Sequence, residues 1–151
     1  MVQGILNSTT VPLLEHVVRF TEQRQKLLAG NIAHFDTPGY KSRDLPVEKF
    51  QQALRDALTA RETQQVTTGV LSSGLPSTQT QQSGSIDRFF PKELFEANTD
   101  NAQNITFQDG NNRSVERAMM EMRKNAARHR FAIEVITSQL NMLQTVISER
   151  P

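Results

Sequence analysis

The strongest pattern in the chain is a row of apolar positions in its last quarter, between Ser114 and about Ser148. The steps between successive members alternate between four and three residues, and no Gly or Pro interrupts them. A sustained heptad row of this kind is typical of a helix that packs lengthwise against other helices. We therefore predict one long C-terminal helix. The row consists of Val115, Met119, Met122, Ala126, His129, Ile133, Ile136, Leu140, Leu143 and Ile147.

A second row with the same alternating spacing lies near the N-terminus and predicts another long helix. Thr9 or Thr10 can cap this helix, and Pro12 suits its first turn because no intrahelical N–H bond is needed there. Arg24 and Asn31 lie on the apolar row, and polar residues on such a seam commonly set the register. The expected fold is mainly α, with the N- and C-terminal helices pairing as an antiparallel coiled coil. The N-terminal row consists of Leu13, Val17, Phe20, Arg24, Leu27 and Asn31.

The N-terminal helix is expected to end near residues 36–39, which read Asp-Thr-Pro-Gly. Pro38 cannot continue a helix and restricts the residue before it, and Gly39 permits a positive φ. Beyond this turn, Pro46 suits the first turn of a short middle helix, which we predict over Pro46–Arg61. The apolar stripe of this helix would contain Phe50, Leu54 and Leu58.

The composition changes abruptly between residues 63 and 85, where 15 of 23 residues are Gln, Ser or Thr and none is charged. So few apolar side chains cannot offset the conformational entropy lost on ordering, so a flexible loop is predicted there. A small β-hairpin using Val66, Val70 and Leu71 is the alternative. Residues 86–107 are expected to be irregular and to lie against the helices.

These elements predict three regions along the chain. Residues 1–62 would form an N-terminal helical segment, residues 63–110 an irregular and partly disordered central segment, and residues 111–151 the C-terminal helix. Residues 1–40 and 111–151 would together form one helical domain. Ser114 would cap the C-terminal helix, after the turn-forming residues 109–112.

The composition of the chain argues against several classes of function. The chain has 151 residues, no Cys and a formal net charge of +1, so neither thiolate chemistry nor an anionic partner is indicated. No apolar run approaches the ~18 residues of a membrane span. The first ten residues lack the basic patch and apolar core of a cleavable secretory signal. Export, if it occurs, is expected to use another route.

Candidate catalytic groups are few. His16, His34 and His129 do not have the spacing of metal ligands, and no phosphate-binding glycine loop or nucleophile elbow is present. His129 is interpreted as a packing residue on the C-terminal row. Met119, Met120 and Met122 could line an adaptable groove, but packing is the better interpretation of their helical spacing. We expect no enzyme activity, no cofactor and no metal.

A resemblance to a known family rests on both ends of the chain. Residues 31–41 read Asn-Ile-Ala-His-Phe-Asp-Thr-Pro-Gly-Tyr-Lys, and residues 119–128 contain Met119-x-x-Met122-x-x-Asn125-x-x-Arg128. The first stretch resembles the signature of bacterial flagellar rod and hook proteins, in which Asn-Ile-Ala-Asn precedes Thr-Pro-Gly-Tyr. His34 departs from the second Asn of that signature. The resemblance covers roughly residues 13–58 and 107–147.

The resemblance implies a structural subunit of the proximal rod of the flagellar basal body, which transmits torque through the periplasm and is required for motility. It implies assembly of the chain with itself, with the rod proteins FlgC, FlgF and FlgG, and with FliE and the inner-membrane ring and export gate. It also implies type III export without a cleavable signal. The alternatives are another rod subunit such as FlgC, or a helical adaptor or chaperone that binds partner helices.

Two groups of residues are predicted to carry this function. The first is an assembly interface on the two terminal helices, and the second is the turn motif that sets the exit angle of the chain. The predicted interface is Leu13, Val17, Phe20, Leu27, Ile32, Met119, Met122, Ile133, Ile136, Leu140 and Leu143. The predicted turn motif is Asn31, Asp36, Thr37, Pro38, Gly39 and Tyr40.

Overall fold

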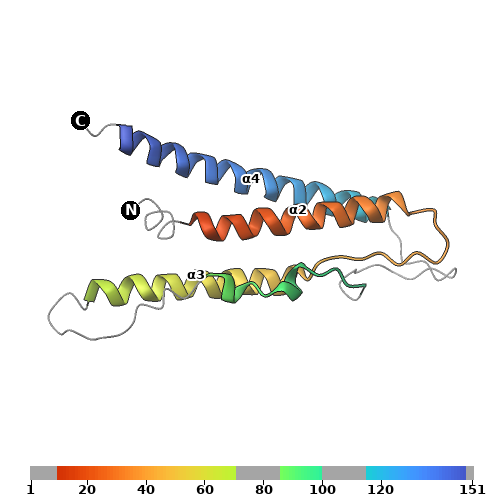
Figure 1. Cartoon of the computed structure of the whole chain (residues 1–151). Helices are drawn as coiled ribbons and strands as arrows, with labels where there is room; N and C mark the ends of the chain where they lie inside the picture. Colours follow the sequence, from red (N-terminus) through yellow and green to blue (C-terminus); the bar gives the residue numbers. More distant parts are fainter. Residues whose placement is uncertain (1–9, 71–85, 100–114, 149–151) are drawn as a thin grey trace.

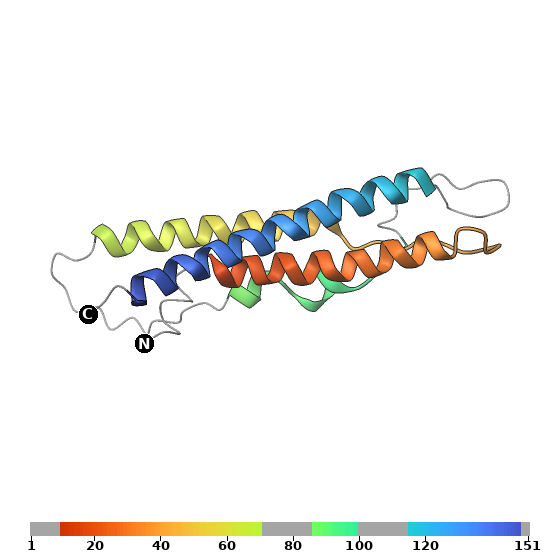
Figure 2. The ribbon, with the colours of Figure 1, turned by 90° about the horizontal axis from the view of Figure 1, so that it is seen from above.

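The computed structural model describes residues 10–70, 86–99 and 115–148, with the backbone alone for residues 64–70. This part of the chain is mainly helical, as predicted. It contains the long helices α2 (Val11–Ala33), α3 (Val47–Val70) and α4 (Val115–Ser148), and the short 3₁₀ turns η1 (Ile86–Phe89) and η2 (Lys92–Phe95). Figures 1 and 2 show these three long helices running lengthwise beside one another. No helix in these ranges is long and apolar enough to cross a membrane.

Helix α2 begins and ends close to the predicted positions. Thr10 occupies the N-cap position and Pro12 the first turn, but the Thr10 side chain makes no capping hydrogen bond. Its hydroxyl oxygen instead accepts a hydrogen bond from the Nε2 amide of Gln139 in α4. The helix stops at Ala33, where the backbone N–H of His34 still donates to the carbonyl of Gly30. The predicted turn at residues 36–39 follows directly.

Helix α3 corrects two predictions. It runs to Val70, so it has 24 residues rather than the predicted 16, and residues 63–70 are helical rather than part of a loop or hairpin. Extending an existing helix requires no new nucleation, and Glu62, Gln64 and Gln65 favour helix. The hydroxyl of Thr63 donates to the carbonyl of Thr59, which satisfies this polar group within the helix. The remaining residues of the predicted loop lie outside the described ranges.

Residues 86–99 are irregular and lie against the helices, as predicted. Asp44 and Asn98 form an isolated antiparallel bridge, which ties this segment to the chain that leads into α3. Phe90 and Leu94 are buried in it. They join a core made by α2, α3 and the two 3₁₀ turns, whose buried members are Leu13, Phe20, Leu45, Phe50, Ala57, Phe90 and Leu94.

Aromatic rings hold this core together. The ring of Phe20 in α2 stacks on that of Phe50 in α3, with centroids 3.9 Å apart and an interplanar angle of 12°. Phe95 packs edge-on against Phe20, at 6.3 Å between centroids. The ring of His16 stacks on Phe90 at 4.4 Å. These large side chains let α2 pack against the middle of the chain on one face while α4 covers another.

Helix α4 has 34 residues, and at about 1.5 Å per residue it is roughly 50 Å long. Its length and position agree with the prediction, while Ser114, its predicted cap, lies outside the described residues. The start of α2 and the end of α4 lie at the same end of the molecule in both views (Figures 1 and 2). Consistently, Thr10 in α2 contacts Gln139, and Arg24, farther along α2, contacts Glu121, which is earlier in α4.

Candidate assembly interface

The contact between α2 and α4 is built from small and polar side chains. Asn125 and Ala132 are the buried residues of α4, and each is only 1% exposed. The Nδ2 amide of Asn125 donates to the carbonyl of Thr21 at 2.7 Å and to Oε1 of Gln25 at 3.0 Å. Ala132 has no side chain beyond Cβ, so the two backbones approach closely at that point. Buried amides need such partners, and this face of α2 supplies them.

His129 is a packing residue of this contact, as interpreted from the sequence. Its Nδ1 lies 2.9 Å from the hydroxyl oxygen of Thr21. That hydroxyl also lies 2.8 Å from the carbonyl of Val17, to which it donates. This contact holds the imidazole ring against α2, whichever of the two groups supplies the proton. Among the described residues, no group of three or more His, Cys, Asp or Glu could hold a metal ion.

The row of α4 that faces α2 is not the full row predicted from apolar spacing. Asn125 and Ala132 are each one residue before a predicted member, Ala126 and Ile133. Met122, His129, Ile136 and Leu143 are half-buried, whereas Met119, Ile133, Leu140 and Ile147 are exposed. The spacing of apolar residues predicted contacts for Ala126 and Ile133 rather than for Asn125 and Ala132. The reason is that this spacing contains no information about the polar groups that α2 presents. Four of the ten members of the predicted row are therefore exposed in the part of the chain that the structure describes.

Two rows of apolar side chains run along α4, and every member except the half-buried Ala126 is exposed. We call Met119, Ala126, Ile133, Leu140 and Ile147 the Ile133 row, because its members repeat every seven residues. We call Met120, Phe131, Met142 and Val146 the Phe131 row, because its first three members repeat every eleven residues. The exposed fraction reaches 65% at Ile147 in the first row and 67% at Phe131 in the second. Exposed apolar surface arranged along one helix is typical of an interaction site.

The predicted interface residues of α2 have a different environment. Leu13 and Phe20 are buried in the core with α3, and Val17 and Leu27 pack against that core. Ile32 is half-buried. In the described chain the first four of these side chains therefore contact the core formed with α3 and residues 86–95. A contact of theirs with another subunit stays a prediction.

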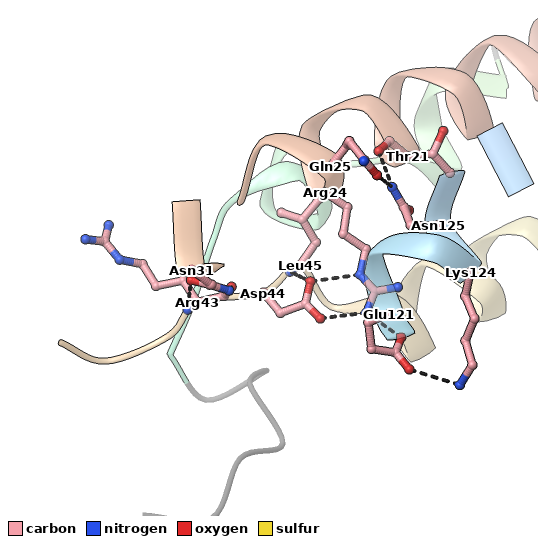
Figure 3. A network of polar contacts seen from close by, with 10 residues as sticks. All are labelled: Thr21, Arg24, Gln25, Asn31, Arg43, Asp44, Leu45, Glu121, Lys124 and Asn125. Atoms are coloured by element: carbon pink, nitrogen blue, oxygen red, sulfur yellow. Dashed lines mark hydrogen bonds and ion pairs between the residues drawn. The ribbon is translucent and has the colours of Figure 1, made fainter. Parts of the chain in front are cut away.

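An ion-pair cluster joins three parts of the chain, and sequence reasoning did not assign it (Figure 3). Arg24 is 4% exposed, and its Nε and one Nη donate to the two carboxylate oxygens of Asp44 at 2.8 and 2.7 Å. The same Nη donates to Glu121 of α4 at 3.1 Å, and Lys124 donates to the other oxygen of Glu121. The cluster fixes α2 against α4 and against the segment before α3. The signal in the sequence that could have indicated the cluster is the charged residue Arg24 on an otherwise apolar heptad row.

The charges of this cluster support one another. Burial disfavours the positive charge of Arg24, but the hydrogen bonds and charges of Asp44 and then Glu121 outweigh burial, so the pKa of Arg24 is raised. Burial acts to raise the pKa of Glu121, but hydrogen bonds from Lys124 and Arg24 outweigh it and hold that pKa below its usual value. Both ionised forms are therefore stabilised by folding.

A pH dependence follows from Glu121. Because its pKa is lowered in the folded state, its ionisation contributes stability above the unfolded pKa of about 4.3, and that contribution is lost as the pH falls through the lower folded pKa. We expect Glu121→Gln to lose under about 1 kcal/mol at pH 7, since the carboxylate is partly exposed. The difference from the unmodified chain should shrink between about pH 5 and 3. Urea unfolding at several pH values measures it, and a difference that grows on acidification would contradict the assignment.

The predicted turn motif is held by Asn31. Its Nδ2 donates to the carbonyl of Arg43 at 2.7 Å, and its Oδ1 accepts from the Arg43 backbone N–H and from the Tyr40 hydroxyl. The ring of His34 stacks on Tyr40 at 4.9 Å. Asn31 therefore closes the loop between α2 and residue 43 rather than setting the register between helices. Asp36, Thr37, Pro38 and Gly39 are exposed at the tip.

Gly39 has the positive φ that the sequence predicted, 73°, with Pro38 before it and a hydrogen bond from the Tyr40 N–H to the Thr37 carbonyl. Pro followed by a positive-φ Gly is the pattern of a type II turn. Gly39→Ala should therefore destabilise the chain by about 1–2 kcal/mol through backbone strain alone, because no described residue beyond its two chain neighbours lies within 4 Å of the added Cβ. Thermal unfolding measures this change.

Gly30 is the matched control, since an added Cβ there also meets open space but its backbone is helical. Gly30→Ala should stabilise by about 0.5–1 kcal/mol. Equal effects at Gly39 and Gly30 would show that residue 39 does not adopt a left-handed conformation in solution.

Comparisons with known proteins find relatives among the flagellar basal body rod proteins. The chain is 26% identical over 135 residues to the flagellar basal body rod protein FlgB of Salmonella typhimurium, covering 88% of each chain. It is 26% identical over 141 residues to FlgB of Escherichia coli, again with 88% coverage of both. With FlgB of Bacillus subtilis it shares 25% identity over 150 residues, covering 95% of this chain and 96% of the relative. No protein-family model matches the chain.

These comparisons confirm the resemblance to flagellar basal-body rod proteins that the sequence predicted. The similarity extends through the middle of the chain, where the signature residues gave no match. Within the rod proteins, the similarity is to FlgB, at modest identity. Because both chain lengths are covered almost entirely, the similarity concerns the whole architecture and not one shared helix.

Proposed function

We propose that this protein is a structural subunit of the proximal rod of the bacterial flagellar basal body. The observation that carries the proposal is the similarity to FlgB proteins over 88–95% of this chain. In the proposed assembly, α2 and α4 pair as an antiparallel coiled coil, and residues 1–40 and 111–151 act as one helical domain. The chain self-assembles through these helices and transmits torque towards the hook and filament.

The physical form of the chain suits that role. Torque on a shaft shears neighbouring subunits against each other, and long helices packed lengthwise distribute the shear over many small contacts. Helix α4 offers such a length, roughly 50 Å, with apolar rows along it. The Arg24 cluster adds resistance to sliding between α2 and α4, because sliding would pull the buried guanidinium away from the carboxylates of Asp44 and Glu121.

The proposed partners follow from the same position in the basal body. They are further copies of this chain, the rod proteins FlgC, FlgF and FlgG, and FliE with the inner-membrane ring and export gate. The chain would reach the periplasm through the flagellar export apparatus without a cleavable signal. These partners come from the resemblance to rod proteins.

A genetic experiment tests the proposal. In the bacterium that carries this gene, its deletion should abolish swimming, and the full chain should restore it. A chain lacking residues 140–151 should not restore swimming, because it loses Leu140, Leu143 and Ile147. The substitution Thr145→Ala, at an exposed position of the same segment, is the control and should restore it. Isolated basal bodies should contain the chain by mass spectrometry. Swimming without the gene, or basal bodies without the chain, would refute the proposal.

A helical adaptor or chaperone is the second candidate. The exposed methionines Met119, Met120 and Met142 favour it, because flexible thioethers suit binding of varied partner helices. The same mass spectrometry separates the two functions. An adaptor or chaperone would be found in the cytoplasm with its client and would be absent from purified basal bodies.

A further inference from the structure

The exposed apolar surface of α4 is divided into two separate flanks. Phe131, Ala132 and Ile133 are consecutive, and consecutive residues of a helix point about 100° apart. Ala132 is buried against α2, whereas Phe131 is 67% and Ile133 is 44% exposed. Phe131 and Ile133 therefore lie on opposite sides of the line where α4 meets α2. The Phe131 row and the Ile133 row continue these two sides along the helix.

The two rows have opposite drift around the helix axis. A seven-residue step falls about 20° short of two full turns, so the Ile133 row winds slowly left-handed. An eleven-residue step passes three full turns by about 20°, so the Phe131 row winds slowly right-handed. When a left-winding row on one helix faces a right-winding row on a neighbour, the two rows incline in the same direction relative to the helix axes. They can then contact each other along their length while the two axes stay parallel. Two copies of the same row incline in opposite directions when they face each other, so they can contact each other along their length only if the two helix axes cross.

We propose that the Ile133 row of one copy of this chain docks on the Phe131 row of the next copy, in a head-to-tail contact. This inference rests on the proposed rod function and names the partner of each flank. Every copy then makes the same contact twice, once through its Ile133 row with one neighbour and once through its Phe131 row with the other. No apolar row stays exposed inside the assembly. Contacts of this kind close into rings or continue as helical arrays. The parallel helix axes suit the wall of a straight shaft.

The contact area sets the expected strength. One flank of α4 is roughly 50 Å long and about 10 Å wide, so one contact buries on the order of 1,000 Å² from both copies together. That is near the lower limit for a specific interface. An isolated pair is therefore weak, but a copy inside an array buries both flanks. The flank of the Ile133 row is also continuous with the α2–α4 contact through His129, which contacts Thr21 of α2.

Complementation between two variants tests the pairing. Ile133→Glu with Leu140→Glu disables one flank, and Phe131→Glu with Met142→Glu disables the other. By sedimentation velocity over a concentration series, the unmodified chain should form oligomers larger than dimers. Each variant alone should stay monomeric, with association weakened by at least about 100-fold, or tenfold per disrupted anchor. An equimolar mixture should form a one-to-one dimer and nothing larger, because each variant supplies one intact flank.

Controls keep the test decisive. Asn141→Glu adds a negative charge at an exposed position in the polar sector between the two rows. A chain with this substitution should associate like the unmodified chain. Circular dichroism checks folding, and Ile133→Ser with Leu140→Ser replaces the first variant if glutamates unfold it. A dimer formed by either variant alone would overturn the proposal, because a row would then pair with itself. A mixture of folded variants that stays monomeric, or an unmodified chain monomeric at every concentration, would also overturn it.

The two proposals fail separately. If basal bodies contain the chain but the mixture does not form the dimer, the row pairing is wrong and the rod function stands. If the dimer forms but basal bodies lack the chain, the rod function is wrong and the pairing of α4 flanks stands.

Discussion

Replacing Phe20 with alanine should lower the free energy of unfolding by about 3–5 kcal/mol. Phe20 is 3% exposed and is the α2 ring at the centre of the aromatic core, stacked on Phe50 and edge-on to Phe95. Its removal leaves a cavity between α2 and the middle of the chain, and the neighbouring rings are tied to two other elements and cannot collapse into it. Urea unfolding followed by circular dichroism measures the loss.

Phe131→Ala is the matched control for this prediction. The same side chain is deleted, but from a position that is 67% exposed on α4. We expect a change within about 0.5 kcal/mol, because exposed substitutions away from special features have small effects. If Phe20→Ala also changed stability by so little, the packing of α3 on α2 would not exist in solution.

Replacing Arg24 with alanine should cost about 3–5 kcal/mol of folding stability. The guanidinium is buried and holds Asp44 through two hydrogen bonds and Glu121 through a third. Its removal leaves two carboxylates near each other without their shared cation, and this penalty exceeds the loss of the attraction itself. The same unfolding experiment measures the effect at pH 7.

Two comparisons identify the cause. Lys26→Ala removes a cation two residues away whose pair with Glu22 is exposed on both sides, so it should change stability by no more than about 0.5 kcal/mol. Adding Asp44→Asn and Glu121→Gln to Arg24→Met should recover most of the loss, because no buried charge then lacks a partner. A triple variant as unstable as Arg24→Ala would show that packing of the arginine stem, and not charge, dominates.

The helices that local signals define agree well with the sequence predictions. An unbroken four-three spacing predicted α4 over nearly its observed length, and Thr10 with Pro12 marked the start of α2. Pro38 and Gly39 placed the turn, and Gly39 has the expected positive φ. The sequence prediction ended α3 too early, because composition is a weak guide to where a helix stops once that helix is already nucleated. Neutral Gln and Thr residues continued it to Val70.

The functional surface depended more on tertiary structure. Sequence reasoning assigned Leu13 and Phe20 to an assembly interface. In the described chain they are core residues, because α3 and residues 86–95 cover that face of α2, and their contact with another subunit stays a prediction. It treated Arg24 and Asn31 as interruptions of an apolar row. The first is the centre of an ion-pair cluster and the second closes the turn, and both find their partners in the segment 40–44.

For α4, the sequence by itself determined that a long helix forms and that apolar residues occupy a broad part of its circumference. Only the tertiary structure decided which line of that circumference meets α2. The reason is that spacing along one helix fixes the angles between side chains but carries no information about the surface opposite. Because α2 presents Thr21, Arg24 and Gln25 there, Asn125 and Ala132 are buried, and the apolar rows on either side are exposed.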